Sequence, residues 1–162
     1  MTRLEERTRY LFIDVGAGTM DVLYYESSSH IHYKAVVKSP VPCVSEEAER
    51  LTGNLLITGS EMGGGALSQV LSQRARSSEV LMTASAAMTI GHSLDRVSSL
   101  GIRIVTDEMA EDLASTGTFS TLHLTDLPME RLEQIVRGFG VPFDFDVVAV
   151  CAQDHGMPPE GI

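Results

Sequence analysis

The sequence predicts an α/β fold, in which a mixed sheet opens with a three-strand antiparallel meander and carries helices on both faces. Three observations predict this. The first forty residues contain three strand-like segments separated by short turns. After them, short apolar segments alternate with segments whose apolar residues recur at helical spacing, which is typical of parallel strands joined by helices. A composition of 43% hydrophobic and 21% charged residues is that of a globular protein.

The opening meander is predicted from residue type and periodicity. Residues 10–13 form a continuous apolar run, which favours a central strand covered on both faces. A glycine-rich turn leads to residues 22–25, which are rich in β-forming side chains, and the serines at 27–29 end that strand. Residues 31–37 alternate between an apolar and a more polar face, so they are predicted to form the third strand.

The rest of the chain is predicted to alternate between strands and helices. Short apolar runs predict further strands at residues 55–58, 80–82, 102–105, 119–124 and 147–152. The last of these has six consecutive apolar residues and is predicted to be a buried strand. A short helix is predicted from Asp107, and apolar stripes predict three longer helices around Leu67, Val70 and Leu71, around Ile90, Leu94 and Val97, and around Met129, Leu132, Ile135, Val136 and Phe139.

Length and charge narrow the domain organisation and the classes of function. Residues 1–155 are predicted to form a single domain, and residues 156–162, rich in proline and glycine, a linker towards a missing second domain. The net charge of −10 repels nucleic acid and anionic lipid, so neither is an expected partner. The sequence contains no signal-peptide pattern and no apolar run of the roughly 20 residues that a membrane helix needs. Two isolated cysteines suit a reducing compartment, so a cytoplasmic location is expected.

The turn between the first two predicted strands is the main candidate site. It reads Asp14-Val15-Gly16-Ala17-Gly18-Thr19-Met20-Asp21. Glycines at 16 and 18, on either side of Ala17, permit positive φ and close backbone approach, so successive N–H groups can converge on an anion, and the Thr19 hydroxyl can add a donor. A carboxylate would repel phosphate directly. Asp14, and Asp21 in the same way, are therefore expected to hold Mg²⁺ or its water shell, which bridges to phosphate oxygens.

Three other interpretations of this turn are possible in principle. A dinucleotide-binding fingerprint would need a third glycine where Asp21 stands and a helix where strand-forming residues follow. A Walker P-loop is excluded, because neither Lys34 nor Lys38 lies in a glycine-rich stretch. A hairpin that binds nothing would explain the two glycines, but it leaves Asp14 with the desolvation cost of a carboxylate at the end of an apolar strand.

Two further clusters are candidates for binding. Gly63, Gly64 and Gly65 open a predicted helix, whose free N–H groups could hold an anion, although a tight strand-to-helix turn explains them equally well. Asp154 follows the last predicted strand. In open α/β sheets, groups just beyond strand ends face the ligand crevice, but a loop acid of no special role is the alternative.

An apolar strand that ends in D-x-G-x-G-T-x-D and turns straight into a second strand resembles the first phosphate motif of the actin, sugar-kinase and heat-shock-chaperone ATPase superfamily. In that superfamily two ribonuclease-H-like domains clamp a Mg-nucleotide. Over nearly the whole chain, the sequence also resembles an uncharacterised prokaryotic family, domain-of-unknown-function family 1786, whose members are about twice as long. The segments that carry this second resemblance are residues 55–59, 62–65, 86–90, 95–97, 139–141 and 153–156.

These resemblances imply a ribonuclease-H-like fold with ATP and Mg²⁺ as ligands. Asp14, Gly16, Gly18 and Thr19 match the phosphate loop. The second phosphate motif and the adenosine-binding glycines belong to the other domain of the superfamily, so a second domain or a second copy is expected to complete the site. Family members are sometimes labelled as related to the pyruvate formate-lyase activating enzyme. A radical iron–sulfur enzyme needs three clustered cysteines, and Cys43 and Cys151 lie far apart.

Three hypotheses about function follow. The first is an ATP-dependent small-molecule kinase or related phosphotransferase, in which Asp14 manages Mg²⁺, the glycine turn cradles phosphate, and Asp154 activates the acceptor, as an aspartate in a comparable place does in sugar kinases of the superfamily. The second is a non-catalytic module that senses nucleotide or binds a partner. The third is a scaffold domain whose hairpin binds nothing.

Overall fold

The computed structural model describes residues 7–60, 64–91 and 93–152. These residues divide into two compact units. The meander unit contains residues 7–39 and 127–152, and the parallel unit contains the described residues from Pro40 to Asp126. Both units combine strands and helices, so the predicted α/β class is confirmed. The boundaries predicted from the sequence, one domain over residues 1–155 followed by a linker, stay a prediction.

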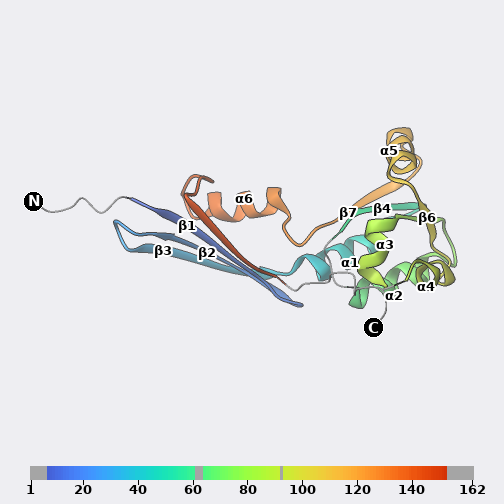
Figure 1. Cartoon of the computed structure of the whole chain (residues 1–162), viewed down its shortest axis with the longest axis horizontal. Coiled ribbons are helices and arrows are strands. Elements are labelled where there is room, and N and C mark those ends of the chain that lie inside the picture. The colour runs from blue at the N-terminus through green and yellow to red at the C-terminus, as the bar shows by residue number, and fades with distance from the viewer. Residues whose placement is uncertain (1–6, 61–63, 92, 153–162) are drawn as a thin grey trace, which may run out of the picture. The chain divides into compact units, whose positions relative to one another are not determined.

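The meander unit is built on a four-stranded mixed sheet (Figure 1). Strands β1 (Arg9–Val15), β2 (Thr19–Glu26) and β3 (Ile31–Lys38) pair antiparallel in sequence order. Strand β8 (Val147–Ala152) returns to pair parallel with β1, so the strand order is β3-β2-β1-β8. The predicted three-strand antiparallel meander is therefore confirmed.

One face of this sheet packs against helix α6 (Met129–Gly138). Alternate residues of the strands face it, since side chains along a strand point to opposite sides. The core between sheet and helix consists of Leu11, Ile13, Val15, Met20, Val22, Leu132 and Val136. Among the described residues, no helix of this unit packs on the opposite face, which we call the open face.

The open face corrects the prediction that residues 10–13 form a strand covered on both sides. Phe12 points to the open face and is 39% exposed. Its ring stacks on that of Tyr10 in the same strand, with a centroid distance of 6.0 Å, and the Tyr10 ring lies 5.8 Å from that of Tyr25 on β2 in a tilted arrangement. Aromatic neighbours thus shield each other across the strands, and an apolar run here does not require a second helical layer.

Strand β8 also differs from its prediction. All six of its residues are exposed, although the run is apolar throughout. The reason is its position, because β8 lies at the edge of the described sheet, next to β1 alone. Length and apolarity predict a strand correctly but cannot tell a central strand from an edge strand.

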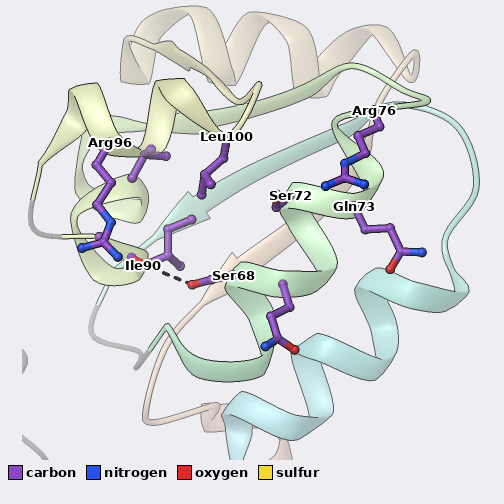
Figure 2. Close-up of a pocket in the computed structure, with 10 residues that line it drawn as sticks. Ser68, Ser72, Gln73, Arg76, Ile90, Arg96 and Leu100 are labelled. Atoms are coloured by element: carbon purple, nitrogen blue, oxygen red, sulfur yellow. Dashed lines mark hydrogen bonds between the residues drawn. The ribbon is translucent and has the colours of Figure 1, made fainter.

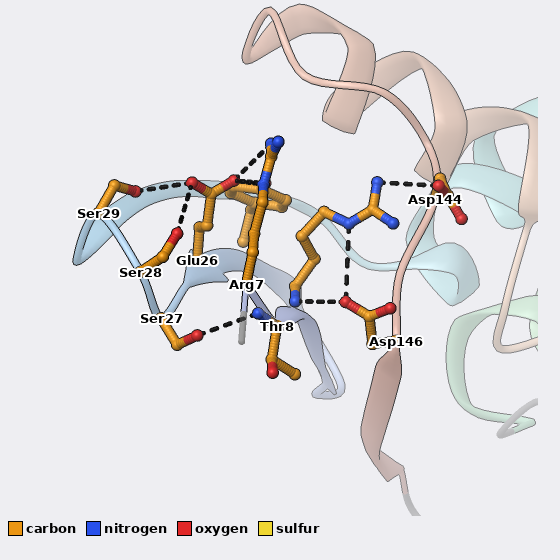
Figure 3. Close-up of polar contacts among 10 residues, drawn as sticks. Arg7, Thr8, Glu26, Ser27, Ser28, Ser29, Asp144 and Asp146 are labelled. Carbon is orange, nitrogen blue, oxygen red and sulfur yellow. Dashed lines mark hydrogen bonds and ion pairs between the residues drawn. The ribbon is translucent and has the colours of Figure 1, made fainter. Parts of the chain in front are cut away.

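Polar contacts fix the register of β8 against β1 at the end of the sheet far from the hairpin (Figure 3). The Arg9 backbone N–H donates to the Asp146 carboxylate at 2.7 Å, and the Asp146 N–H donates to the Arg9 carbonyl at 3.0 Å. The Arg9 guanidinium also pairs with Asp144 at 2.8 Å. These bonds hold the segment that leads into β8 beside the first residue of β1.

A second set of polar contacts joins Arg7, just before β1, to the end of β2 (Figure 3). The Ser29 hydroxyl donates to the Glu26 carboxylate at 2.9 Å, and the Arg7 guanidinium pairs with it at 2.7 Å. Both contacts favour the ionised acid and hold the pKa of Glu26 below its usual value. The pKa of the neighbouring Tyr24 phenol shifts in the other direction. It is raised, chiefly because the ring is buried.

The parallel unit contains a second four-stranded sheet in which all strands are parallel. Its strands are β4 (Leu55–Gly59), β5 (Val80–Thr83), β6 (Arg103–Val105) and β7 (Ser120–Leu124), in the order β6-β5-β4-β7. Its helices are α1 (Pro40–Arg50), α2 (Gly65–Arg74), α3 (Ala84–Ile90), α4 (Leu94–Ser99) and α5 (Asp107–Thr116).

Helices cover both faces of this second sheet. Leu55 and Ile57 of β4 pack in a core with residues of α1 to α4, such as Leu71 of α2. Leu56, on the opposite face of β4, packs with Ala110 of α5. The helices predicted on both faces are thus found around the parallel sheet, whereas the meander sheet has one covered face and one open face among the described residues.

Two local predictions in the parallel unit were wrong. One continuous helix was predicted through Ile90, Leu94 and Val97, but Gly91 ends α3 in an extended conformation (φ −161°), and α4 starts at Leu94. Helix α1 was not predicted at all. In the part of the chain that is described, no helix is long and apolar enough to cross a bilayer.

Candidate functional site

The predicted phosphate turn forms the tip of the β1–β2 hairpin. The Gly16 N–H donates to the Thr19 carbonyl at 2.9 Å, and the Gly18 carbonyl accepts from the Ser39 N–H at 3.0 Å. The chain passes directly from this tip into strand β2. A dinucleotide-binding fingerprint requires a helix at that point, so the structure argues against that interpretation.

The tip glycines behave differently from the expectation of positive φ. Neither Gly16 nor Gly18 has a left-handed conformation. A Cβ atom at Gly16 would lie 3.1 Å from the Thr19 carbonyl oxygen, whereas a Cβ at Gly18 would meet no heavy atom within 4 Å. The described fold therefore has no need for glycine at 18, and the space beside it is open to a ligand.

The backbone of the tip offers hydrogen-bond donors. Residues 16–19 are exposed, and within the described residues the N–H groups of Ala17 and Gly18 have no backbone acceptor. Two consecutive free N–H groups at an exposed turn can bind an anion, in the manner of the backbone concavities that hold phosphate.

Asp14 and Asp21 lie directly opposite each other in the β1–β2 register, with both side chains on the open face. The Lys34 ammonium of β3 pairs with Asp21 at 2.6 Å. Asp14 has no ion-pair partner among the described residues. All three side chains line one pocket of about 430 Å³, whose other walls include Phe12, Leu23 and Cys151.

The exposure of Asp14 corrects one expectation from the sequence. A hairpin without a ligand was expected to leave Asp14 with a desolvation cost, but its side chain lies on the open face and is exposed. Like charges directly opposite each other on two strands repel, and Lys34 compensates one of the two carboxylates. One uncompensated negative charge remains, so the pocket favours a cation.

The two carboxylates of this pocket, Asp14 and Asp21, are too few to hold a metal ion without other ligands, but they are enough for magnesium. Within the described residues, no group of three or more histidine, cysteine or acidic side chains could hold a metal ion. Magnesium is commonly held by one or two carboxylates, with water and phosphate oxygens as its other ligands. Asp14, with Asp21 beside it, fits that pattern.

Lys34 and Cys151 are site residues that the sequence analysis missed. Asp14 is flanked by Cys151 of β8 on one side and by Asp21 of β2 on the other. The alternation of residues 31–37 already placed Lys34 on the polar face of its strand. The missing information was the pairing register, which alone brings residue 34 opposite Leu23 and within reach of Asp21.

The other predicted site residues lie elsewhere or outside the described residues. Gly64 and Gly65 belong to the parallel unit, while Gly63 and Asp154 fall outside the described residues. A Cβ atom on Gly64 would lie 3.0 Å from the Ile90 carbonyl oxygen. Close packing against α3 therefore accounts for glycine at 64, as the tight-turn alternative expects, and anion binding by these three glycines stays a prediction.

Residues 62–161, more than half of the chain, match the model of the family described as "Putative pyruvate format-lyase activating enzyme (DUF1786)". The chain belongs to this family. Neither the curated proteins nor the solved structures give a match to it. The DUF1786 match starts after the hairpin, so the hairpin site is supported by its own geometry and not by the family match.

The DUF1786 description implies an iron–sulfur cluster, because the activating enzyme that it names is a radical enzyme. Clusters of that kind are held by cysteine thiolates. These 162 residues contain two cysteines, Cys43 on α1 and Cys151 on β8, which lie in different units. The cysteines present do not fit such a cluster.

Proposed function

We propose that the meander unit is the phosphate-binding half of an ATPase or small-molecule kinase of the actin-like superfamily. The observation that carries this proposal is the arrangement of Asp14, Asp21 and Lys34 in one pocket on the open face, beside a glycine tip with free N–H groups. The sheet supports the ribonuclease-H-like fold that the resemblance implies, since a three-strand meander is followed by a parallel strand beside β1.

The charged groups of the pocket and the polar groups of the hairpin tip each have a role in this proposal. Asp14 would hold Mg²⁺ directly or through water, and the metal would supply positive charge to the phosphates of ATP. Asp21, paired with Lys34, would be the second carboxylate available to the metal. The N–H groups of Ala17 and Gly18, together with the Thr19 hydroxyl, donate to phosphate oxygens. Asp154, which lies outside the described residues, remains the proposed base that accepts the proton of an acceptor hydroxyl.

The first test measures Mg-ATP binding by isothermal titration calorimetry. We expect Asp14→Asn to weaken Mg-ATP binding by about tenfold or more and to abolish the difference between ATP with Mg²⁺ and ATP with a chelator. Gly18→Ala should weaken binding without lowering the melting temperature, because a Cβ there clashes with nothing in the protein but occupies the space next to the phosphates.

Asp112→Asn is the matched control, since it removes one exposed carboxylate from α5 in the other unit. Equal Mg-ATP affinities for wild type, Asp14→Asn and Asp112→Asn would contradict the proposed site. If Mg-ATP binds in the proposed way, Asp154→Asn then separates the two functional hypotheses. Loss of turnover with binding retained supports the kinase, whereas binding without any turnover in the wild type supports a nucleotide sensor.

A second domain or a second copy is the proposed partner that completes this site. The exposed apolar strand β8 supports a partner here, because Val147, Val148 and Val150 are each more than 40% exposed and β8 flanks Asp14. Edge strands with exposed apolar side chains are ready-made pairing surfaces.

A second copy is tested by measuring Mg-ATP affinity and sedimentation of this chain over a range of protein concentrations. If a second copy completes the site, dimer formation and nucleotide affinity rise together, since a ligand stabilises the state that binds it. Val148→Lys should then abolish both the dimer and the gain in affinity. A chain that stays monomeric and binds Mg-ATP with a constant affinity would exclude the second copy and leave the second domain.

A further inference from the structure

The parallel unit contains a second pocket, of about 510 Å³, that plays no part in the hairpin site. Figure 2 shows its two sides. One side is formed by α2 and the residues just after it, and the other by residues of α3, of α4 and next to these helices. Arg76 comes just after α2 and Arg96 lies on α4, so the two arginines reach the pocket from different walls.

The charge balance of the chain makes these two arginines unusual. Acidic residues outnumber basic ones by 22 to 12, so carboxylate partners are plentiful. Many of the described basic side chains form an ion pair with a carboxylate. They are Arg7, Arg9, Lys34, Arg50, Arg103 and Arg137. Arg76 and Arg96 form no ion pair with any described residue, and both line the same pocket.

The rest of the lining is divided between polar and apolar groups. On the α2 side, Ser72 and Gln73 present a hydroxyl and an amide. Across from them, Ile90, Val97 and Leu100 provide an apolar wall. A concave site with an apolar wall and a few charged or polar groups is the usual form of a small-molecule site.

We propose that this pocket binds a small organic oxyanion, with a carboxylate or phosphate group held by Arg76 and Arg96. Guanidinium groups match both kinds of anion because their N–H donors form a planar fork. The hydroxyl and amide of Ser72 and Gln73 bind further oxygen atoms of the ligand, and its carbon skeleton packs on the apolar wall. The site belongs to the parallel unit and does not depend on nucleotide binding at the hairpin.

The test is an NMR titration of the full chain with sodium succinate in one arm and sodium glycerol phosphate in the other. Sodium chloride keeps the ionic strength constant, and succinamide serves as the uncharged control. We expect saturable shifts of the Arg76 and Arg96 Nε–H signals, and of the amide of Gly91, which also lines the pocket, with at least one anion and none with succinamide. Saturation by succinate alone assigns a carboxylate ligand, and saturation by glycerol phosphate alone assigns a phosphate ligand.

Arg76→Gln and Arg96→Gln should each weaken binding of the active anion by about tenfold or more. Both side chains are exposed and unpaired within the described residues, so the melting temperature should stay unchanged. Arg103→Gln is the matched control, because it removes an arginine of the same unit that is paired with Glu79. The proposal is overturned if neither anion gives saturable shifts, or if both pocket variants bind as tightly as the Arg103→Gln control.

Discussion

Replacing Gly59 by alanine should lower the free energy of unfolding by roughly 2–5 kcal/mol, which combines the strain of a left-handed alanine with the cost of overpacking. Gly59 ends β4 with φ +86°, and a Cβ atom there would clash with the Leu124 carbonyl oxygen and lie 2.8 Å from the Leu124 nitrogen. These atoms belong to the backbone of β7, which pairs with β4, so the clash can be relieved only by moving a strand.

Gly53→Ala is the matched control for this effect. Gly53 also has a left-handed conformation, at φ +74°, but a Cβ atom there meets nothing within 4 Å. Its substitution should therefore cost only the backbone strain, about 1–2 kcal/mol. Urea unfolding followed by circular dichroism measures both variants. Equal losses in the two would show that the contact with Leu124 is not the cause.

The meander was predictable from the sequence because its signals are local. Alternation along residues 31–37 and the breaks at the glycine tip and at Ser27 define three neighbouring strands joined by short turns. The same locality put Asp14 and Asp21 at opposite sides of one turn. Their pairing across the hairpin follows from two strands connected by three residues.

The division into two sheets was not predictable in the same way. Each strand of the parallel unit is marked by its own short apolar run, but nothing in a run says which other run it pairs with. Residues 40–126, which follow β3 and precede α6 in the sequence, belong to the other unit. They therefore separate β8 in sequence from β1, the strand with which it pairs. Long-range pairing of this kind leaves no periodic signal in either strand.

Helix α1 was not predicted because it contains Pro40 and Pro42, and proline ordinarily interrupts a helix. Both lie in the first turn of the helix. The N–H groups of a first turn have no partner within the helix, so proline is tolerated there. The site residue Lys34 was missed for a different reason, since its face was evident from the alternation but its partner depends on the register with β2.

Replacing Arg74 by methionine should have the second large effect, a loss of about 2–4 kcal/mol in the free energy of unfolding. The Arg74 guanidinium, from the last turn of α2, donates to three backbone carbonyls, one in the last turn of α1 and two just after this helix ends at Arg50. They are those of Ala48 at 3.1 Å, of Leu51, and of Gly53 at 2.6 Å. The last carbonyls of a helix lack partners within it and carry the negative end of its dipole, so one cation satisfies both needs.

Two further substitutions separate the hydrogen bonds of Arg74 from its charge. Arg74→Lys keeps the charge but loses the planar fork, so it should retain only part of the stability. Arg103→Met removes an arginine that forms an exposed ion pair with Glu79, at 3.2 Å. This substitution should lower the free energy of unfolding by less than about 1 kcal/mol. If urea unfolding gave the same loss for Arg74→Met as for Arg103→Met, the bridge from α2 to the end of α1 would contribute nothing beyond an ordinary surface pair. A lysine variant as stable as the wild type would instead mean that charge alone, and not the three carbonyl bonds, holds the two helices together.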